Sequence, residues 1–212
     1  MTGTFVTFEG IEGCGKTTQA ARLKAALEKR GKVVILTREP GGTPIGAKLR
    51  EILLDPMTRQ LVPLAELLLY EADRAQHVAE TIRPALEAGK IVLCDRYVDA
   101  STAYQGAARG VSADMVRTLN TIASGGLTPM LTLLLDLPEE TSVGRARERA
   151  LKAGAKPDRF EREALGFHKA VRQGYLELAA REPTRFRVLN GDRPVEEVEK
   201  DVLEIVLAGI GP

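Results

Sequence analysis

The chain has 212 residues, of which 44% are hydrophobic and 28% are charged, and its net charge is +1. This length favours a single domain, and these proportions are ordinary for a globular protein. The near-zero net charge gives no field that would attract nucleic acid or a membrane surface, and neither a signal peptide nor a membrane span is expected.

Short apolar runs alternate along the chain with longer amphipathic patterns. The runs expected as strands are rich in β-branched and aliphatic residues and cover 4–8, 32–37, 90–95, 130–136 and 185–190. The segments expected as helices carry apolar residues at helical spacing and cover 16–30, 45–54, 64–88, 113–123 and 139–151. This alternation predicts an α/β fold in which a parallel five-stranded sheet has helices on both faces and right-handed crossovers.

Charged residues follow the first four apolar runs. They are Glu9, Arg38–Glu39, Asp95–Arg96 and Asp136. Ligands of open parallel sheets bind beyond the carboxyl ends of the strands. We therefore expect these charges to gather around one crevice.

The first strand leads into a glycine-rich loop that reads G-I-E-G-C-G-K-T over residues 10–17 and matches G-x-x-x-x-G-K-[ST]. Glycines let backbone N–H groups surround phosphate oxygens, Lys16 supplies a positive charge, and the Thr17 hydroxyl can ligate Mg²⁺. The alternative is a turn that merely caps a helix. The residues expected to hold the nucleoside triphosphate are Gly10, Ile11, Glu12, Gly13, Cys14, Gly15, Lys16, Thr17 and Thr18.

Cys14 is best explained as a small residue that the loop tolerates. It and Cys94 have neither metal-site nor disulfide spacing, so a reduced, cytoplasmic setting fits best.

The loop alone indicates only nucleotide binding, because GTPases, ATPases and small-molecule kinases share it. No N-K-x-D motif for guanine is present. The second strand instead opens into "TREPGGTPIG", where Arg38 suits a second phosphate and Gly41 and Gly42 permit close backbone approach. The alternative is a turn with a surface salt bridge.

The third strand ends in "CDRYVDASTAYQG". Asp95 can hold Mg²⁺ through water, and Arg96 can hold both phosphoryl groups during transfer. Taken alone, the pair could equally be a helix N-cap with a surface ion pair. Its expected position beside Lys16 and Arg38 favours the functional interpretation.

Five segments together resemble the thymidylate kinases in order and spacing: "FEGIEGCGKTT", "TREPGGTP", "YEADRAQH", "CDRYVDASTAYQG" and "PDRFE". The resemblance covers nearly the whole chain. It implies a P-loop NTPase-type kinase with a closing lid, usually a homodimer, that transfers the γ-phosphoryl group of Mg²⁺-ATP to dTMP and gives dTDP and ADP. The alternatives are another P-loop nucleoside monophosphate or deoxynucleoside kinase, and a nucleotide-dependent interaction module without activity.

The resemblance also assigns roles to individual residues. Glu12 would lie near the sugar 3′-hydroxyl and the transferred phosphate, and Arg38 and Arg96 would hold the dTMP phosphate. The base and sugar would be bound by Tyr70 stacking on thymine, Arg74 donating to O4, Tyr104 under the deoxyribose, and Ser101 and Gln105 lining the base pocket. Without the resemblance, Tyr70 would be a core aromatic and Arg74 a partner of Asp73. Ala100 departs from the family, which often has Ser there, so the detail of thymine contact differs.

The segment 145–160 is expected to form the lid and carries Arg145, Arg147, Arg149, Lys152, Lys156 and Arg159. Some phosphoryl-transfer enzymes supply an arginine in cis to the transferred phosphoryl group. The phosphate loop has none, and the bacterial type that this chain resembles places it in the lid. Arg149 is the first candidate, ahead of Arg145 and Arg159, although the cluster could also be a solvated face.

The resemblance thus gives Lys16, Glu12, Arg96 and Arg149 as the expected catalytic residues. His77 and His168 lack company that would suit a metal and are expected to be surface or packing residues.

Overall fold

A parallel five-stranded sheet with the strand order β2–β3–β1–β4–β5 runs through the molecule. The structure is a computed structural model that describes residues 3–58, 60–152, 154 and 157–210. The strands are β1 (Thr4–Glu9), β2 (Val34–Arg38), β3 (Ile91–Asp95), β4 (Leu131–Asp136) and β5 (Phe186–Asn190). All five predicted strands are confirmed, with bounds that differ from the prediction by at most two residues.

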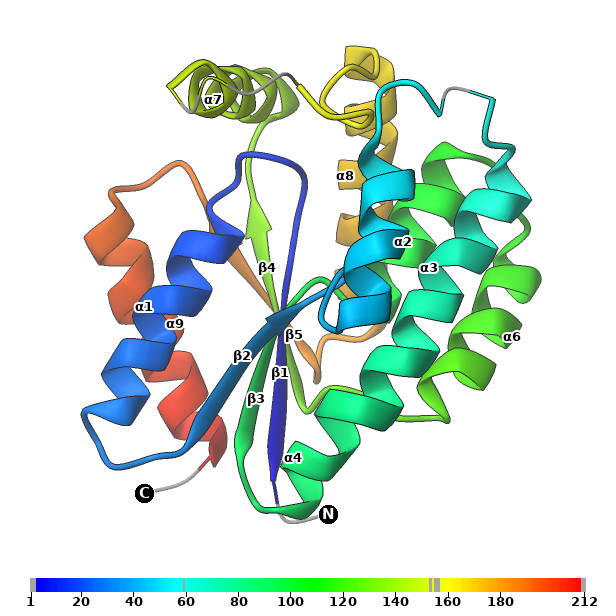
Figure 1. The fold of residues 1–212 in the computed structure, drawn as a ribbon. Helices are drawn as coiled ribbons and strands as arrows, with labels where there is room; N and C mark the ends of the chain where they lie inside the picture. Colours follow the sequence, from blue (N-terminus) through cyan, green and yellow to red (C-terminus); the bar gives the residue numbers. More distant parts are fainter. Residues whose placement is uncertain (1–2, 59, 153, 155–156, 211–212) are drawn as a thin grey trace.

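Helices cover both faces of the sheet, as predicted (Figure 1). One face packs against α1 (Lys16–Glu28) and α9 (Val195–Ile210), whose buried residues join those of the strands in one cluster. The elements on or beyond the other face are α2 (Pro44–Leu54), α3 (Pro63–His77), η1 (Val78–Ile82), α4 (Arg83–Glu87), α5 (Val98–Ser101), η2 (Thr102–Ala108), α6 (Ala113–Ser124) and α8 (Leu165–Arg181).

The segment predicted as one helix over 64–88 consists of α3, the π-helical turn η1 and α4 in direct succession. Three further helical stretches fall where the sequence prediction placed none: 98–108, 165–181 and 195–210. In α9 the signal was available, because Val198, Val202 and Val206 recur at four-residue spacing and are all buried. In α8 the buried face also carries His168 and Tyr175, which breaks the apolar stripe.

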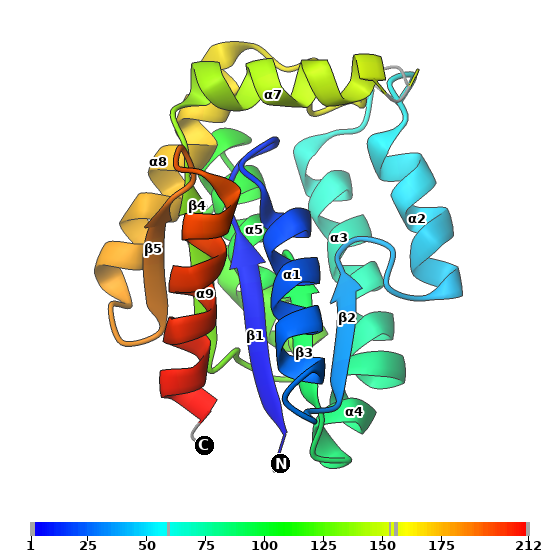
Figure 2. The same ribbon diagram turned by 90° about the vertical axis from the view of Figure 1, so that its left-hand side faces the viewer.

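Helix α7 (Glu139–Lys152) lies across the carboxyl ends of the strands (Figure 2). It forms the first part of the expected lid, of which residues 153 and 155–156, and so Lys156, lie outside the described residues. Ser142 on α7 donates a hydrogen bond to the carbonyl of Glu12. The helix is therefore in direct contact with the phosphate loop. In the described part of the chain, no helix is long and apolar enough to cross a membrane.

Candidate active site

The carboxyl ends of β2 and β3 and the loop after β1 border a cavity of about 510 Å³. Sheet register sets Arg38 beside Asp95, and both line the cavity together with Arg96. The expectation that all the strand-end charges gather here is wrong for Glu9 and Asp136. Glu9 is buried behind the cavity, and Asp136 pairs with Arg172 at 2.7 and 2.9 Å.

The phosphate loop has the backbone that its glycines predict. Gly10, Gly13 and Gly15 have φ values of 136°, 74° and 100°, in the left-handed region that favours glycine. A Cβ at Gly13 would lie 2.4 Å from the carbonyl oxygen of Ser142, so α7 can approach only because this residue is glycine. Lys16 Nζ donates to the carbonyls of Gly10 and Ile11 at 3.0 and 2.9 Å, which holds its charge at the mouth of the loop.

The side chains of the loop divide into two groups. Those of Glu12, Lys16 and Thr17 line the cavity. Those of Ile11 and Cys14 are 2% and 3% exposed and belong to the hydrophobic core. The Ile11 and Cys14 side chains therefore face away from the cavity, although Cys14 Sγ accepts a hydrogen bond from Lys16 Nζ at 3.5 Å.

The two residues expected to hold a metal lie side by side. Thr17 Oγ1, at the start of α1, donates to Asp95 Oδ2, at the end of β3, over 2.6 Å. A hydroxyl and a carboxylate oxygen are the hard donors that Mg²⁺ prefers, and Mg²⁺ usually takes only one or two protein ligands beside phosphate oxygens and water. The residues present thus fit the metal that the sequence predicts.

Glu12 and Arg96 form a charged pair at the centre of the cavity wall. Arg96 donates to Glu12 Oε1 at 2.9 Å, and Tyr104 donates to the same oxygen at 2.6 Å. His168, which was expected to be a surface or packing residue, lies 3.3 Å from the other oxygen. Burial opposes ionisation of Glu12, but Arg96, the His168 hydrogen bond and Lys16 outweigh it and hold the pKa well below the usual range.

The backbone of Arg96 is left-handed, with φ of 73°, which is rare for a residue with a side chain. Its N–H nevertheless donates to Phe8 O at 2.9 Å, and its guanidinium also bonds Tyr175 on α8 at 3.2 Å. Uncommon conformations of this kind are held by surrounding contacts and cluster at functional sites.

Glu9 forms a second acidic position immediately behind Arg96. It accepts hydrogen bonds from the Tyr97 N–H at 2.7 Å and from the Tyr175 hydroxyl at 2.6 Å. Burial, aided by the negative charge of Asp99, raises the pKa of Glu9 to about 8. Sequence reasoning noted Glu9 but missed Tyr175, because α8 itself was not predicted.

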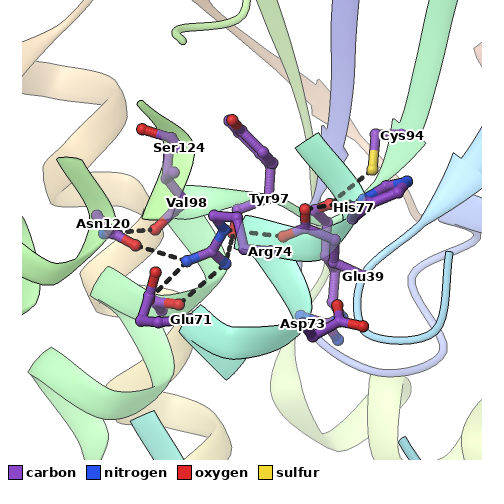
Figure 3. A network of polar contacts seen from close by, with 12 residues as sticks. Glu39, Glu71, Asp73, Arg74, His77, Cys94, Tyr97, Val98, Asn120 and Ser124 are labelled. Carbon is purple, nitrogen blue, oxygen red and sulfur yellow. Dashed lines mark hydrogen bonds and ion pairs between the residues drawn. The ribbon is translucent and has the colours of Figure 1, made fainter. Parts of the chain in front are cut away.

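Arg74 is nearly inaccessible and lies in a buried polar network (Figure 3). Its five N–H groups are all engaged by protein acceptors: Glu39 at 2.8 Å, Glu71 at 2.6 Å, Asn120 at 2.7 Å, the Tyr97 carbonyl at 3.1 Å and Ser101 Oγ at 3.1 Å. The simple alternative of a pair with Asp73 is not observed among these bonds. Arg74 does line the cavity, but donation to a thymine O4 requires it to share or exchange one of these bonds.

The loop after β2 also needs glycine, because its backbone packs closely against α3. A Cβ at Gly42 would lie 2.4 Å from His77 Nε2, so the backbone must approach α3 as well as the cavity. His77 is buried between Glu39, at 3.0 Å, and Thr37, at 2.6 Å. Of the two expectations for His77, surface or packing, its burial fits the second.

The aromatic residues expected around a base and sugar converge on one side of the cavity. Tyr70 lies 6.4 Å and Tyr104 lies 5.5 Å from Phe160, measured between ring centroids. Ser101 and Gln105 line the same wall. Phe160 lies in the quoted "PDRFE" segment, but sequence reasoning gave it no role of its own.

Arg50 on α2 was also missed. It lines the cavity with Arg38 and Arg96 and donates to the Pro40 carbonyl at 2.9 Å. Burial and the nearby charge of Arg38 lower the pKa of its guanidinium. A helix residue twelve positions beyond Arg38 carried no separate signal in the sequence.

The arginines of the lid segment have different surroundings. Arg149 is exposed, pairs with Glu161 at 2.6 Å and lines the cavity. Arg145 pairs with Asp192 at 2.8 Å. Arg159 is buried and bonds Glu66 and the Leu53 carbonyl, so it anchors the segment and does not reach toward the phosphate loop.

Comparison with known proteins agrees with this geometry. The family model described as thymidylate kinase matches residues 8–202. The chain belongs to the thymidylate kinase family. It is 57% identical to the thymidylate kinase of Syntrophotalea carbinolica, over 92% of this chain and 90% of that protein. It is 53% identical to the thymidylate kinase of Deinococcus radiodurans, over 94% of each chain.

The fold also resembles that of a solved thymidylate kinase. The crystal structure of the thymidylate kinase from Ehrlichia chaffeensis superposes with a TM-score of 0.77 at 30% identity and covers 97% of this chain and 99% of that chain. Membership in the thymidylate kinase family makes the chain a phosphotransferase of the nucleoside monophosphate kinase type, and the resemblance drawn from five motifs is confirmed. The roles of individual site residues stay predictions.

Proposed function

We propose that the cavity is the active site at which this kinase transfers the γ-phosphoryl group of ATP to dTMP, giving dTDP and ADP. The observation that carries the proposal is that two sets of cationic groups line one cavity. We assign Lys16 and the phosphate loop to one anion site, and the guanidinium groups of Arg38, Arg50 and Arg96 to a second. A protein that only binds a nucleotide needs no second anion site.

The donor side is built from the loop and the end of β3. Backbone N–H groups of the loop and Lys16 bind the triphosphate, and the α1 N-terminus adds its partial positive charge. Thr17 and Asp95 would hold Mg²⁺. When bound, the ion neutralises charge on the β- and γ-phosphoryl oxygens. The turn at Asn190–Arg193 lies beside the loop, since a Cβ at Gly191 would be 3.2 Å from the Cys14 carbonyl, and is a neighbour for adenine.

The acceptor side places a phosphate, a sugar and a base in succession. Arg38, Arg50 and Arg96 hold the phosphate of dTMP, and Glu12 lies where the sugar 3′-hydroxyl approaches. The rings of Tyr70, Tyr104 and Phe160 enclose the pyrimidine and deoxyribose. Such positioning of both reactants supplies most of the catalysis in phosphoryl transfer, which needs little covalent chemistry from the protein.

The segment 145–160 acts as a lid that carries Arg149 to the transferred phosphoryl group. The position of Arg149 on the cavity wall, at the exposed end of α7, supports this role. Closure would exchange its partner Glu161 for a phosphoryl oxygen, because a guanidinium binds both acceptors with the same donor fork.

The substrate is tested by measuring ADP release from Mg²⁺-ATP with a panel of acceptors: dTMP, dUMP, dCMP, dAMP, dGMP and thymidine. We expect dTMP to give the highest kcat/KM and thymidine none, because the acceptor arginines need a phosphate. A higher kcat/KM for a purine monophosphate or for the nucleoside would replace the proposal with another P-loop kinase. Nucleotide binding without turnover would replace it with a binding module.

A homodimer and a cytoplasmic location complete the proposal. Both described cysteines are buried and unpaired, in keeping with a reducing compartment. Neighbouring helices α3 and α6 expose the apolar side chains of Leu64, Leu68, Met115 and Ile122, and groups of exposed apolar side chains are typical of association surfaces. Light scattering after size exclusion should give twice the chain mass, and Ile122→Asp should halve it, whereas Leu151→Asp on α7 should not.

A further inference from the structure

A buried carboxylate that has no role in the proposed function touches the base pocket. Glu66 on α3 is fully buried and accepts hydrogen bonds from two other segments of the chain. Gln105 Nε2 on η2 lies 2.7 Å from Oε1, and Arg109 Nε lies 3.4 Å from the same oxygen. Arg159 NH1, from the lid segment, bonds Oε2.

This contact determines which end of the Gln105 amide faces the cavity. A carboxylate flanked by two guanidinium groups only accepts hydrogen bonds, so the amide must present its NH₂ group to Glu66. The amide oxygen Oε1 then lies on the opposite branch. Within the described residues, no hydrogen bond reaches this oxygen, and it keeps some solvent access. Gln105 lines the cavity. The branch of the amide that carries Oε1 is therefore the one left to face the cavity, which Tyr70 and Ser101 also line.

We propose that Glu66 is a positioning residue that makes Gln105 select pyrimidines with an N3–H group over pyrimidines whose N3 is an acceptor. Thymine and uracil carry a hydrogen at N3, and cytosine carries a lone pair. This inference rests on the proposed function, which places the pyrimidine in this cavity. It identifies Glu66 as the residue on which discrimination between pyrimidines with and without an N3–H group depends.

The glutamine alone could not discriminate. A free amide turns over about its last bond and offers its oxygen to thymine or its NH₂ group to cytosine at similar cost. Turned over in this pocket, its oxygen would face a Glu66 oxygen at the present 2.7 Å contact, and two acceptors would meet. With Glu66 in this position, cytosine must instead leave its N3 and the Gln105 oxygen both unpaired, which sites built for a hydrogen bond reject strongly.

The test compares kcat/KM for dTMP, dUMP and dCMP in the full-length enzyme and in Glu66→Gln. An amide at position 66 can donate as well as accept, so both orientations of Gln105 become available. We expect the dTMP-to-dCMP ratio of kcat/KM to fall by about 10-fold or more, with the change mainly in KM for dCMP. The dTMP-to-dUMP ratio should stay the same, because both bases carry N3–H.

Arg159→Gln is the matched control. It removes the bond to Oε2 of the same carboxylate, which also anchors the lid segment, but leaves the Glu66–Gln105 contact at Oε1 intact. Its dTMP-to-dCMP ratio should stay within about 2-fold of the parent value. An unchanged ratio in Glu66→Gln would overturn the inference. So would an equal fall in Arg159→Gln, because the effect would then come from the ion pair.

A second variant keeps the inference testable if Glu66→Gln does not fold. Gln105→Met keeps a flexible side chain of similar length but has no amide, so it should lower the dTMP-to-dCMP ratio by raising KM for dTMP. An unchanged ratio there also overturns the inference. Tyr70→Ala distinguishes failure of this inference from failure of the proposed function. If KM for dTMP does not rise in that variant, the pyrimidine does not bind beside Tyr70, and the proposed pocket itself is wrong.

Discussion

The hydroxyl of Tyr104 donates to Glu12 Oε1 at 2.6 Å and so joins helix segment η2 directly to the phosphate loop. Arg96 donates both to that carboxylate oxygen, at 2.9 Å, and to the tyrosine hydroxyl, at 2.8 Å. The three side chains thus form a closed triangle at the point where the acceptor sugar and the transferred phosphoryl group meet in the proposed complex. We expect the ring and the hydroxyl of Tyr104 to have separable functions.

The ring of Tyr104 is expected to exclude a ribose 2′-hydroxyl. Tyr104→Phe keeps the ring, so its preference for dTMP over ribothymidine monophosphate should stay within about 3-fold of the parent, while kcat falls because Glu12 and Arg96 lose a shared partner. Tyr104→Ala should lower the preference by about 10-fold or more. Steady-state kinetics with both sugars measure this, and an unchanged preference in Tyr104→Ala contradicts the packing role.

Lys16 is expected to act on the phosphoryl group and not on the fold. Lys16→Ala should lower kcat by about 10²-fold or more, because it removes a charge aimed at the transferring group. Circular dichroism and the unfolding midpoint should change little. Lys29→Ala, just beyond the far end of the same helix, is the control and should keep full activity. Near-normal turnover of Lys16→Ala would refute the assignment.

Arg149 is expected to act only in the transition state. Arg149→Ala should lower kcat and kcat/KM together by about 10²-fold, with KM for ATP and dTMP moving only a few-fold. Arg149→Lys should recover part of the loss, since an ammonium cannot make the bidentate contact.

Arg147→Ala is the internal control for the lid, because Arg147 is exposed on the same helix and should be dispensable. The reverse result, in which Arg147 is critical and Arg149 is not, would reassign the role. Full activity in all the lid variants would make the basic cluster a solvated face.

Arg74 is expected to contribute more to stability than an arginine in an exposed ion pair does. Arg74→Ala leaves Glu39 and Glu71 as buried carboxylates without their cation, and it should lower the free energy of unfolding by about 3–5 kcal/mol. Urea unfolding measures this. Arg117→Ala removes an exposed ion pair with Asp114 and should leave the midpoint nearly unchanged. A stable Arg74→Ala protein with only a raised KM for dTMP would restrict Arg74 to base recognition.

Glu9 should make stability fall as pH rises. Its pKa is raised in the folded protein from 4.5 to about 8, so the folded state binds more protons than the unfolded state between those values. The stabilisation is complete below about pH 4.5 and is lost as pH rises toward 8, with a slope of at most about 1.4 kcal/mol per pH unit. The difference in unfolding free energy between the parent and Glu9→Gln, measured from pH 5 to 9, isolates this slope. A constant difference would contradict the shift.

Local chemistry explains why the sequence predicted so much of this protein. The strands are continuous apolar runs, the phosphate loop is a contiguous motif, and Arg38, Asp95 and Arg96 stand at strand ends that a parallel sheet must bring together. These features depend on neighbours in sequence or on one rule of sheet topology. They could be placed without knowledge of packing.

Only the tertiary structure determines which side chains from distant parts of the chain contact the residues of the site. The occupied donors of Arg74, the Glu12 contact of His168, and the burial of Glu9 behind Arg96 all depend on helices that fold back onto the sheet from far along the chain. Burial favours a raised pKa for both Glu9 and Glu12, which are only three residues apart, but the partners of Glu12, Arg96 first among them, lower its pKa instead. No local pattern encodes this difference, because a carboxylate takes its charge state from the groups that surround it in space.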